Sequence, residues 1–118
     1  MTIRLKRAYE EPSRRDGFRI LVERLWPRGI RKDAAAINLW AKEVAPSATL
    51  RKWFDHEPDR WNEFKRRYCA ELDRNRDTVD AIAKLSRDGP VTFVFGSKET
   101  RFNNAVALKE YVERSETP

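Results

Sequence analysis

Six polar side chains that could bind an anion follow two apolar stretches of the sequence. They are Arg24, Arg28, Ser97, Lys98, Asn103 and Asn104. The arginine guanidinium is a planar fork of donors suited to phosphate or carboxylate, and hydroxyl and amide groups supply further hydrogen bonds. The sequence therefore predicts a binding site for an anionic or phosphorylated small ligand, provided that the two apolar stretches end side by side.

Both apolar stretches are predicted to be buried strands. The first runs from Phe18 to Leu25, and its centre, ILV, lacks the polar alternation of a half-exposed strand. Pro27 and Gly29 then end it. The second is VTFVF at residues 91–95. If the two strands are parallel, their carboxyl ends meet at one edge of the sheet, which is where open α/β sheets bind ligands.

The rest of the chain supplies an edge strand and several helices. Ile3 and Leu5 alternate with basic residues, which is typical of an edge strand. Residues 31–45 fit a helix through their alanines or a strand through alternating apolar residues, and this choice stays open. Helices are expected to begin near Ser47, Pro58, Asp77 and Asn103.

This order predicts a single α/β domain over residues 1–118. We expect a three- to four-stranded, mainly parallel sheet flanked by about four helices. A helical crossover of the observed length is what two parallel strands require.

Composition narrows the class of protein. The net charge is +6, 40% of residues are hydrophobic and 37% are charged. No apolar run approaches the roughly 18 residues of a membrane span, so no membrane partner is expected. The first residues lack the apolar centre of a signal peptide, and one cysteine cannot form an internal disulfide. We therefore expect a cytoplasmic protein.

The basic excess lies in the first third of the chain. Residues 1–32 contain ten Lys or Arg and four Asp or Glu, whereas the remaining 86 residues contain equal numbers of each sign. This excess could be a solvated surface, or it could attract an anionic partner. A nucleic-acid-binding accessory protein that uses this region with Trp26 is therefore an alternative function. Its mark would be binding that weakens steeply with salt.

An enzyme of unknown reaction is a third possibility. Glu23, Glu99 or His56 could act as acid or base, although His56 could equally cap the preceding helix. Cys69 lies on an apolar helical stripe, which favours a core thiol over a catalytic one. No metal-ligand spacing and no nucleotide-binding fingerprint occurs, so we expect no metal and no cofactor.

Blocks of residues across nearly the whole chain match one family. They are DGFRILVERLWPRG at 16–29, APSATLRKWF at 45–54, HEPDRWNEFKRRYCAEL at 56–72 and VTFVFGSKETRFNNAVALKEYV at 91–112. In this order they resemble the bacterial YeaO-like family within domain of unknown function 488, which supplies no substrate.

That resemblance also bears on catalysis. Related sequences often have tyrosine where this chain has Phe95 and histidine where it has Asn104. Longer, more distant relatives carry a cysteine-histidine-arginine run near the final loop, where this chain has Asn103 and Asn104. The resemblance therefore implies that neither chemistry at these positions, nor a thiol mechanism there, transfers to this chain.

Overall fold

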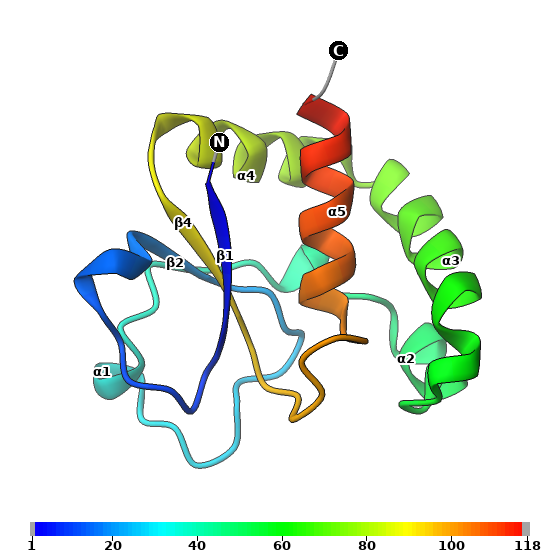
Figure 1. Ribbon diagram of the computed structural model, residues 1–118, viewed down its shortest axis with the longest axis horizontal. Helices are drawn as coiled ribbons and strands as arrows, with labels where there is room; N and C mark the ends of the chain where they lie inside the picture. The colour runs from blue at the N-terminus through cyan, green and yellow to red at the C-terminus, as the bar shows by residue number, and fades with distance from the viewer. Residues whose placement is uncertain (1, 117–118) are drawn as a thin grey trace.

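A four-stranded parallel sheet forms the centre of the computed structural model, which describes residues 2–116 (Figure 1). Its strands are β1 (Ile3–Arg7), β2 (Phe18–Leu21), β3 (Leu39–Trp40) and β4 (Val91–Phe95). They lie in the order β1-β4-β2-β3, and every neighbouring pair is parallel. The two apolar strands β2 and β4 are therefore adjacent and parallel, as the sequence predicts, and β1 lies at an edge.

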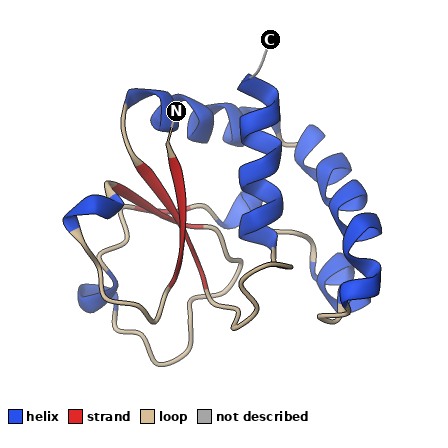
Figure 2. Ribbon diagram, viewed as in Figure 1, coloured by secondary structure: helices blue, strands red, loops and turns tan. Residues whose placement is uncertain are grey.

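Five α-helices accompany the sheet within the described residues. They are α1 (Lys32–Ala35), α2 (Ala48–Phe54), α3 (Trp61–Asp73), α4 (Arg76–Asp88) and α5 (Asn104–Glu116), with 3-10 turns η1 (Arg14–Asp16), η2 (Lys42–Val44) and η3 (Pro58–Arg60). Figures 1 and 2 show α3 and α5 to the right of the sheet and the short α1 to the left. The predicted small α/β fold is confirmed. None of the helices in the described part of the chain is long and apolar enough to cross a membrane.

Both faces of the sheet are covered. Ile20, Phe93 and their neighbours on one face pack against the apolar sides of the larger helices. On the other face, Leu21 and Val94 pack against Trp26 and Trp40 from the segment that follows β2. Because Ile20, Leu21 and Val94 are fully buried, the prediction of strands without a wet side is confirmed.

Strand β2 is shorter than the predicted Phe18–Leu25. The ladder to β4 extends one residue beyond Leu21, because the Val22 amide donates to the Val94 carbonyl at 3.1 Å. Beyond that point the backbone carbonyls accept from side chains. Asn104 Nδ2 donates to Val22 O at 2.8 Å, and Trp40 Nε1 donates to Glu23 O at 2.8 Å. The ladder between β2 and β4 therefore ends at Val22, three residues before the predicted end of the strand at Leu25.

The ambiguous segment 31–45 contains both candidate structures. Four residues form α1, and Leu39 and Trp40 then pair with Ile20 and Leu21 as β3. Each periodicity in the sequence therefore applies to one half of the segment.

Two of the expected helix caps are present and one is displaced. Ser47 Oγ accepts from the Leu50 amide at 3.1 Å, and Asn103 Oδ1 accepts from the Val106 amide at 3.0 Å. The helix expected to begin near Asp77 is α4, which begins at Arg76 with Asn75 at its N-cap position, so Asp77 lies inside the helix and does not cap it. The Asn75 carbonyl accepts from the Val79 amide at 3.2 Å, which is a hydrogen bond of the first turn of α4.

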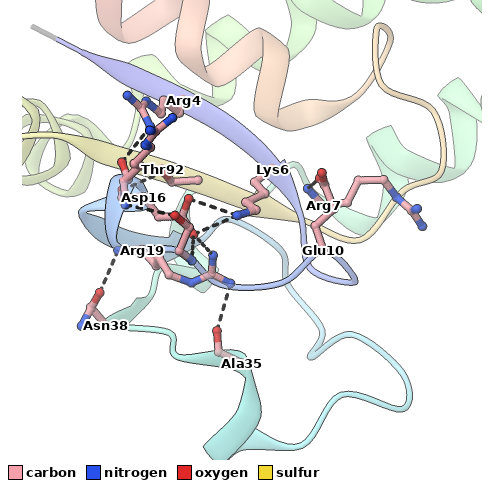
Figure 3. A network of polar contacts seen from close by, with 11 residues as sticks. Arg4, Lys6, Arg7, Glu10, Asp16, Arg19, Ala35, Asn38 and Thr92 are labelled. Carbon is pink, nitrogen blue, oxygen red and sulfur yellow. Dashed lines mark hydrogen bonds and ion pairs between the residues drawn. The ribbon is translucent and has the colours of Figure 1, made fainter.

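A buried polar network joins η1 to three strands, and Figure 3 shows its side chains converging on Asp16. Arg19 Nη1 donates to Asp16 Oδ2 at 2.6 Å, and Lys6 Nζ lies 3.2 Å from the same carboxylate. Arg19 Nη2 donates to the Ala35 carbonyl at 2.9 Å, and Thr92 Oγ1 donates to Asp16 O at 2.7 Å. Asp16 and Arg19 are 4% and 3% exposed, so this is a desolvated ion pair.

Candidate functional site

The carboxyl ends of β2 and β4 open onto one edge of the sheet. Their register aligns Leu21 with Val94, so the chain leaves both strands at nearly the same level. The loop after β2 and the loop between β4 and α5 therefore lie together, as the sequence predicts for a ligand site at a strand edge.

A pocket of about 490 Å³ lies at this edge, between the two loops and α2. Its volume falls within the range of about 300–1,000 Å³ that is usual for small-molecule sites. The pocket is lined by Glu23, Pro46, Ala48, Arg51, Lys52, Phe54, Asp55, His56, Phe64, Gly96, Ser97, Phe102, Asn103 and Asn104.

Hydrogen bonds between the two loops fix one wall of this pocket. Glu23 Oε2 accepts from the Gly96 amide at 3.3 Å, and Asn104 Nδ2 donates to Val22 O at 2.8 Å. The end of β2 is thus tied to both ends of the loop between β4 and α5. Glu23 and Asn104 are only partly buried, so each keeps a surface toward the pocket.

Helix α2 and the two residues after it supply another part of the lining, which includes three basic side chains. Arg51, Lys52 and His56 all line the pocket and are all exposed. The helix is held at its start by Ser47, whose amide and hydroxyl donate to Glu71 of α3 at 2.8 and 2.7 Å. At its end, Asp55 and His56 have φ values of 49° and 55°.

That end of α2 also decides the role of His56 in the fold. Asp55, and not His56, occupies the C-cap position, where its amide donates to the Arg51 carbonyl. Aspartate and histidine tolerate the left-handed region better than bulky residues do. Two consecutive left-handed residues reverse the chain directly beside the pocket, which places His56 on its lining.

Three phenyl rings, those of Phe54, Phe64 and Phe102, belong to the apolar part of the lining. Phe54 and Phe64 stack with their centroids 4.5 Å apart, and Trp61 packs against both rings. Phe102 contacts Trp61 at 5.5 Å between centroids. Since these rings hold one another in place, the pocket has a rigid aromatic wall beside its polar groups.

The loop before α5 is stabilised by hydrogen bonds from its own backbone to the Glu99 carboxylate. Glu99 Oε2 accepts from the amides of Arg101 and Phe102 at 2.7 and 3.3 Å. These backbone hydrogen bonds, that from Arg101 above all, lower the pKa of Glu99. The amides of Arg101 and Phe102 are therefore already occupied within the loop, and the Arg and Lys side chains in the pocket lining are those of Arg51 and Lys52 on α2.

Half of the predicted site residues reach the pocket. Ser97, Asn103 and Asn104 line it. Of the described residues in the lining, none is Arg24, Arg28 or Lys98, and all three of these side chains are exposed. Their ligand-binding role stays a prediction.

The two arginines make other contacts. Arg24 Nη2 donates to the Pro46 carbonyl at 3.4 Å, just outside the pocket. The Arg28 carbonyl accepts from the Tyr9 hydroxyl at 2.9 Å, in the segment that covers the opposite face of the sheet.

Two other residues singled out from the sequence are engaged elsewhere. Trp26 donates through Nε1 to Ile30 O at 2.7 Å and meets Trp40 edge-on at 5.4 Å, so its ring is held within the fold. Cys69 lies in a separate groove between α3 and α5, and burial raises the pKa of its thiol. No group of three or more His, Cys, Asp or Glu with metal-site geometry occurs among residues 2–116.

Comparison with known proteins places the chain in a family. A family model described as "Inactive DUF488-N3 subclade" matches residues 2–117. The "Uncharacterized protein YeaO" of Escherichia coli K12 is 38% identical over 112 residues, which cover 95% of this chain and 97% of that protein. The chain belongs to the YeaO-like DUF488 family.

Further family members are found in mycobacteria. Uncharacterised proteins of Mycobacterium bovis and Mycobacterium tuberculosis are each 39% identical over 108 residues, covering 92% of this chain and 91% of theirs. No solved structure matches the chain at a significant level.

Proposed function

We propose that this DUF488 protein binds a small anionic, phosphorylated ligand at the carboxyl edge of its sheet and does not turn it over. The observation that carries the proposal is one pocket whose lining contains both Arg51 and Lys52 of α2 and the residues that follow β2 and β4. Arginine and lysine are the usual partners of phosphate groups, and strand ends are the usual place for such sites. The single cysteine, which cannot form an internal disulfide, favours action in a reducing compartment such as the cytoplasm.

The absence of turnover is supported by the residues at two positions. The family description names an inactive subclade. Phe95, where related sequences often have tyrosine, is 3% exposed in the core. Asn104, at a position where related sequences often have histidine, donates a hydrogen bond to the Val22 carbonyl. Both side chains thus serve the fold, and a phenyl ring and an amide cannot exchange protons as general acid or base.

The lining is not uniformly positive. Glu23 and Asp55 share it with Arg51, Lys52 and His56. A ligand that is anionic all over would meet repulsion from these carboxylates. The charge pattern therefore favours a ligand with one anionic end and a hydrogen-bond donor at the other.

Removing both α2 cations is expected to abolish this binding. Thermal shift and calorimetry would be run with inorganic phosphate, glucose 6-phosphate, AMP and GMP. A probe at 100 times its dissociation constant adds about 2.7 kcal/mol to stability. In Arg51→Ala/Lys52→Ala the affinity should fall by at least about tenfold for each charge lost, because each removes a hydrogen bond to a charged group.

A matched control separates the site from net charge. Arg74→Ala/Lys84→Ala removes the same two charge types from exposed positions that do not line the pocket. This variant should bind as the wild-type protein does. Absence of any shift with all four probes would contradict the proposed function, and equal losses in the two variants would show that the pocket is not the site.

A further inference from the structure

The identity of the ligand can be inferred from three features of the pocket, an inference that rests on the proposed function. The first is the aromatic wall of Phe54, Phe64 and Phe102. Phe54 and Phe64 are buried and stacked on each other, so they support the wall, and Phe102, which is partly exposed, offers the accessible aromatic surface. Rigid aromatic surfaces accept flat apolar bodies, and nucleic acid bases are the usual flat partners of such rings.

The second feature is the carboxylate of Glu23. It stands at the end of β2 with Oε2 held by the Gly96 amide, which fixes the direction of the group. Its Oε1 accepts no hydrogen bond from the residues that the structure describes. An ionised carboxylate only accepts hydrogen bonds, and two parallel bonds to adjacent donors are its strongest arrangement.

These properties discriminate among the bases. Guanine presents N1–H and a 2-amino group side by side, so both can donate to one carboxylate. Adenine presents an amino group beside an unprotonated ring nitrogen, whose lone pair would face the second carboxylate oxygen. A partly buried polar group left without its partner is penalised more than a missing apolar contact.

The third feature is the pair of cations on α2. Arg51 and Lys52 line the same pocket as Glu23 and the phenyl rings but are exposed, which suits a charged group that stays partly hydrated. We propose that the pocket binds a guanine nucleotide, with Glu23 accepting from N1–H and the 2-amino group, Phe102 contacting the base, and Arg51 and Lys52 holding the phosphate.

Calorimetry with GMP, IMP, AMP and inorganic phosphate tests this assignment. IMP retains N1–H and lacks the 2-amino group, so it removes one of the two donors. GMP should bind about tenfold or more tightly than AMP, since a good bidentate contact discriminates by that order, and IMP should fall between them. Inorganic phosphate should bind more weakly than any nucleotide.

The variant Glu23→Gln isolates the carboxylate. Glutamine has nearly the same shape and can still accept from the Gly96 amide, but its amide nitrogen cannot accept from guanine. GMP should lose about tenfold in affinity and its preference over AMP should disappear, while phosphate binding should not weaken, because the substitution removes a negative charge from the lining. The control is Lys84→Ala, an exposed residue of α4 that does not line the pocket, and it should keep the wild-type order of affinities for the four probes.

The outcomes separate the two proposals. Equal affinities for GMP, IMP and AMP in the wild-type protein would overturn the guanine assignment and leave phosphate binding intact. No binding of any probe would overturn the proposed function itself. If Glu23→Gln does not fold, the order of the four probes on the wild-type protein still decides the assignment.

Discussion

Replacement of Asp16 by asparagine is expected to lower the free energy of unfolding by about 3–5 kcal/mol. The carboxylate is paired with Arg19 at 2.6 Å, and the exposed fractions of the two side chains are 6% and 4%. Asparagine would keep one acceptor oxygen, but its amide nitrogen cannot accept as the second carboxylate oxygen does, and the arginine charge would be buried without a counter-charge. Arg19 Nε is already buried without a hydrogen-bond partner among the described residues, so the site has no spare polar group to compensate.

Urea denaturation of both proteins at neutral pH measures this loss. Asp59→Asn is the control, because Asp59 is exposed in η3 and its replacement should change stability by no more than about 0.5 kcal/mol. A loss below about 1 kcal/mol in Asp16→Asn would show that water reaches the ion pair and that the network in Figure 3 contributes less to stability than its burial indicates.

The same pair should make the protein sensitive to acid. Burial alone would raise the pKa of Asp16, but hydrogen bonds from the Ser13 amide, Lys6 and Arg19 outweigh it and lower the pKa below its ordinary value. The stabilisation is therefore complete above the ordinary pKa of about 3.9 and is lost as the pH falls below it. Asp16→Asn lacks this titration, so the difference in stability between the two proteins should narrow below about pH 4.

This network shows which part of the fold the sequence could predict. The runs at residues 20–22 and 91–95 are long and apolar enough to identify β2 and β4, and the crossover rule then makes them parallel neighbours. Arg19, by contrast, is a charged residue in a strand predicted to be buried, and the apolar pattern does not say which group would pair with it. In the structure Arg19 donates to the Ala35 carbonyl and pairs with Asp16. The contact with Ala35 depends on tertiary structure, which the local sequence pattern does not contain.

The candidate site divides in the same way. Ser97, Asn103 and Asn104 follow directly from the rule that ligands bind at strand ends, because their position depends only on the element before them. Arg51 and Lys52 could not be predicted, since nothing local says that α2 faces this edge. Its direction is set by the bonds between Ser47 and Glu71, which are 24 residues apart.

Replacement of Gly17 by alanine is expected to cost about 4 kcal/mol, from backbone strain of about 1–3 and overpacking of about 1–3 kcal/mol. Gly17 has φ +63°, which side chains rarely adopt, and a Cβ there would lie 2.3 Å from Pro90 O. That carbonyl accepts from the Phe18 amide at 3.0 Å at the start of β2, so moving it would disturb the pairing of β2 with β4.

Two other glycines separate strain from crowding. Gly29 has φ +82°, and a Cβ added there would meet no atom within 4 Å, so Gly29→Ala should show only the strain of about 1–2 kcal/mol. Gly89 is extended, with φ 174°, and is equally open, so Gly89→Ala should be neutral or stabilising by up to about 1 kcal/mol. In thermal and urea unfolding of the three variants, the free energy of unfolding should therefore be clearly lower for Gly17→Ala than for Gly29→Ala. If these two lose the same amount, the close approach of Gly17 to Pro90 contributes nothing, and the start of β2 is held by the Asp16 network alone.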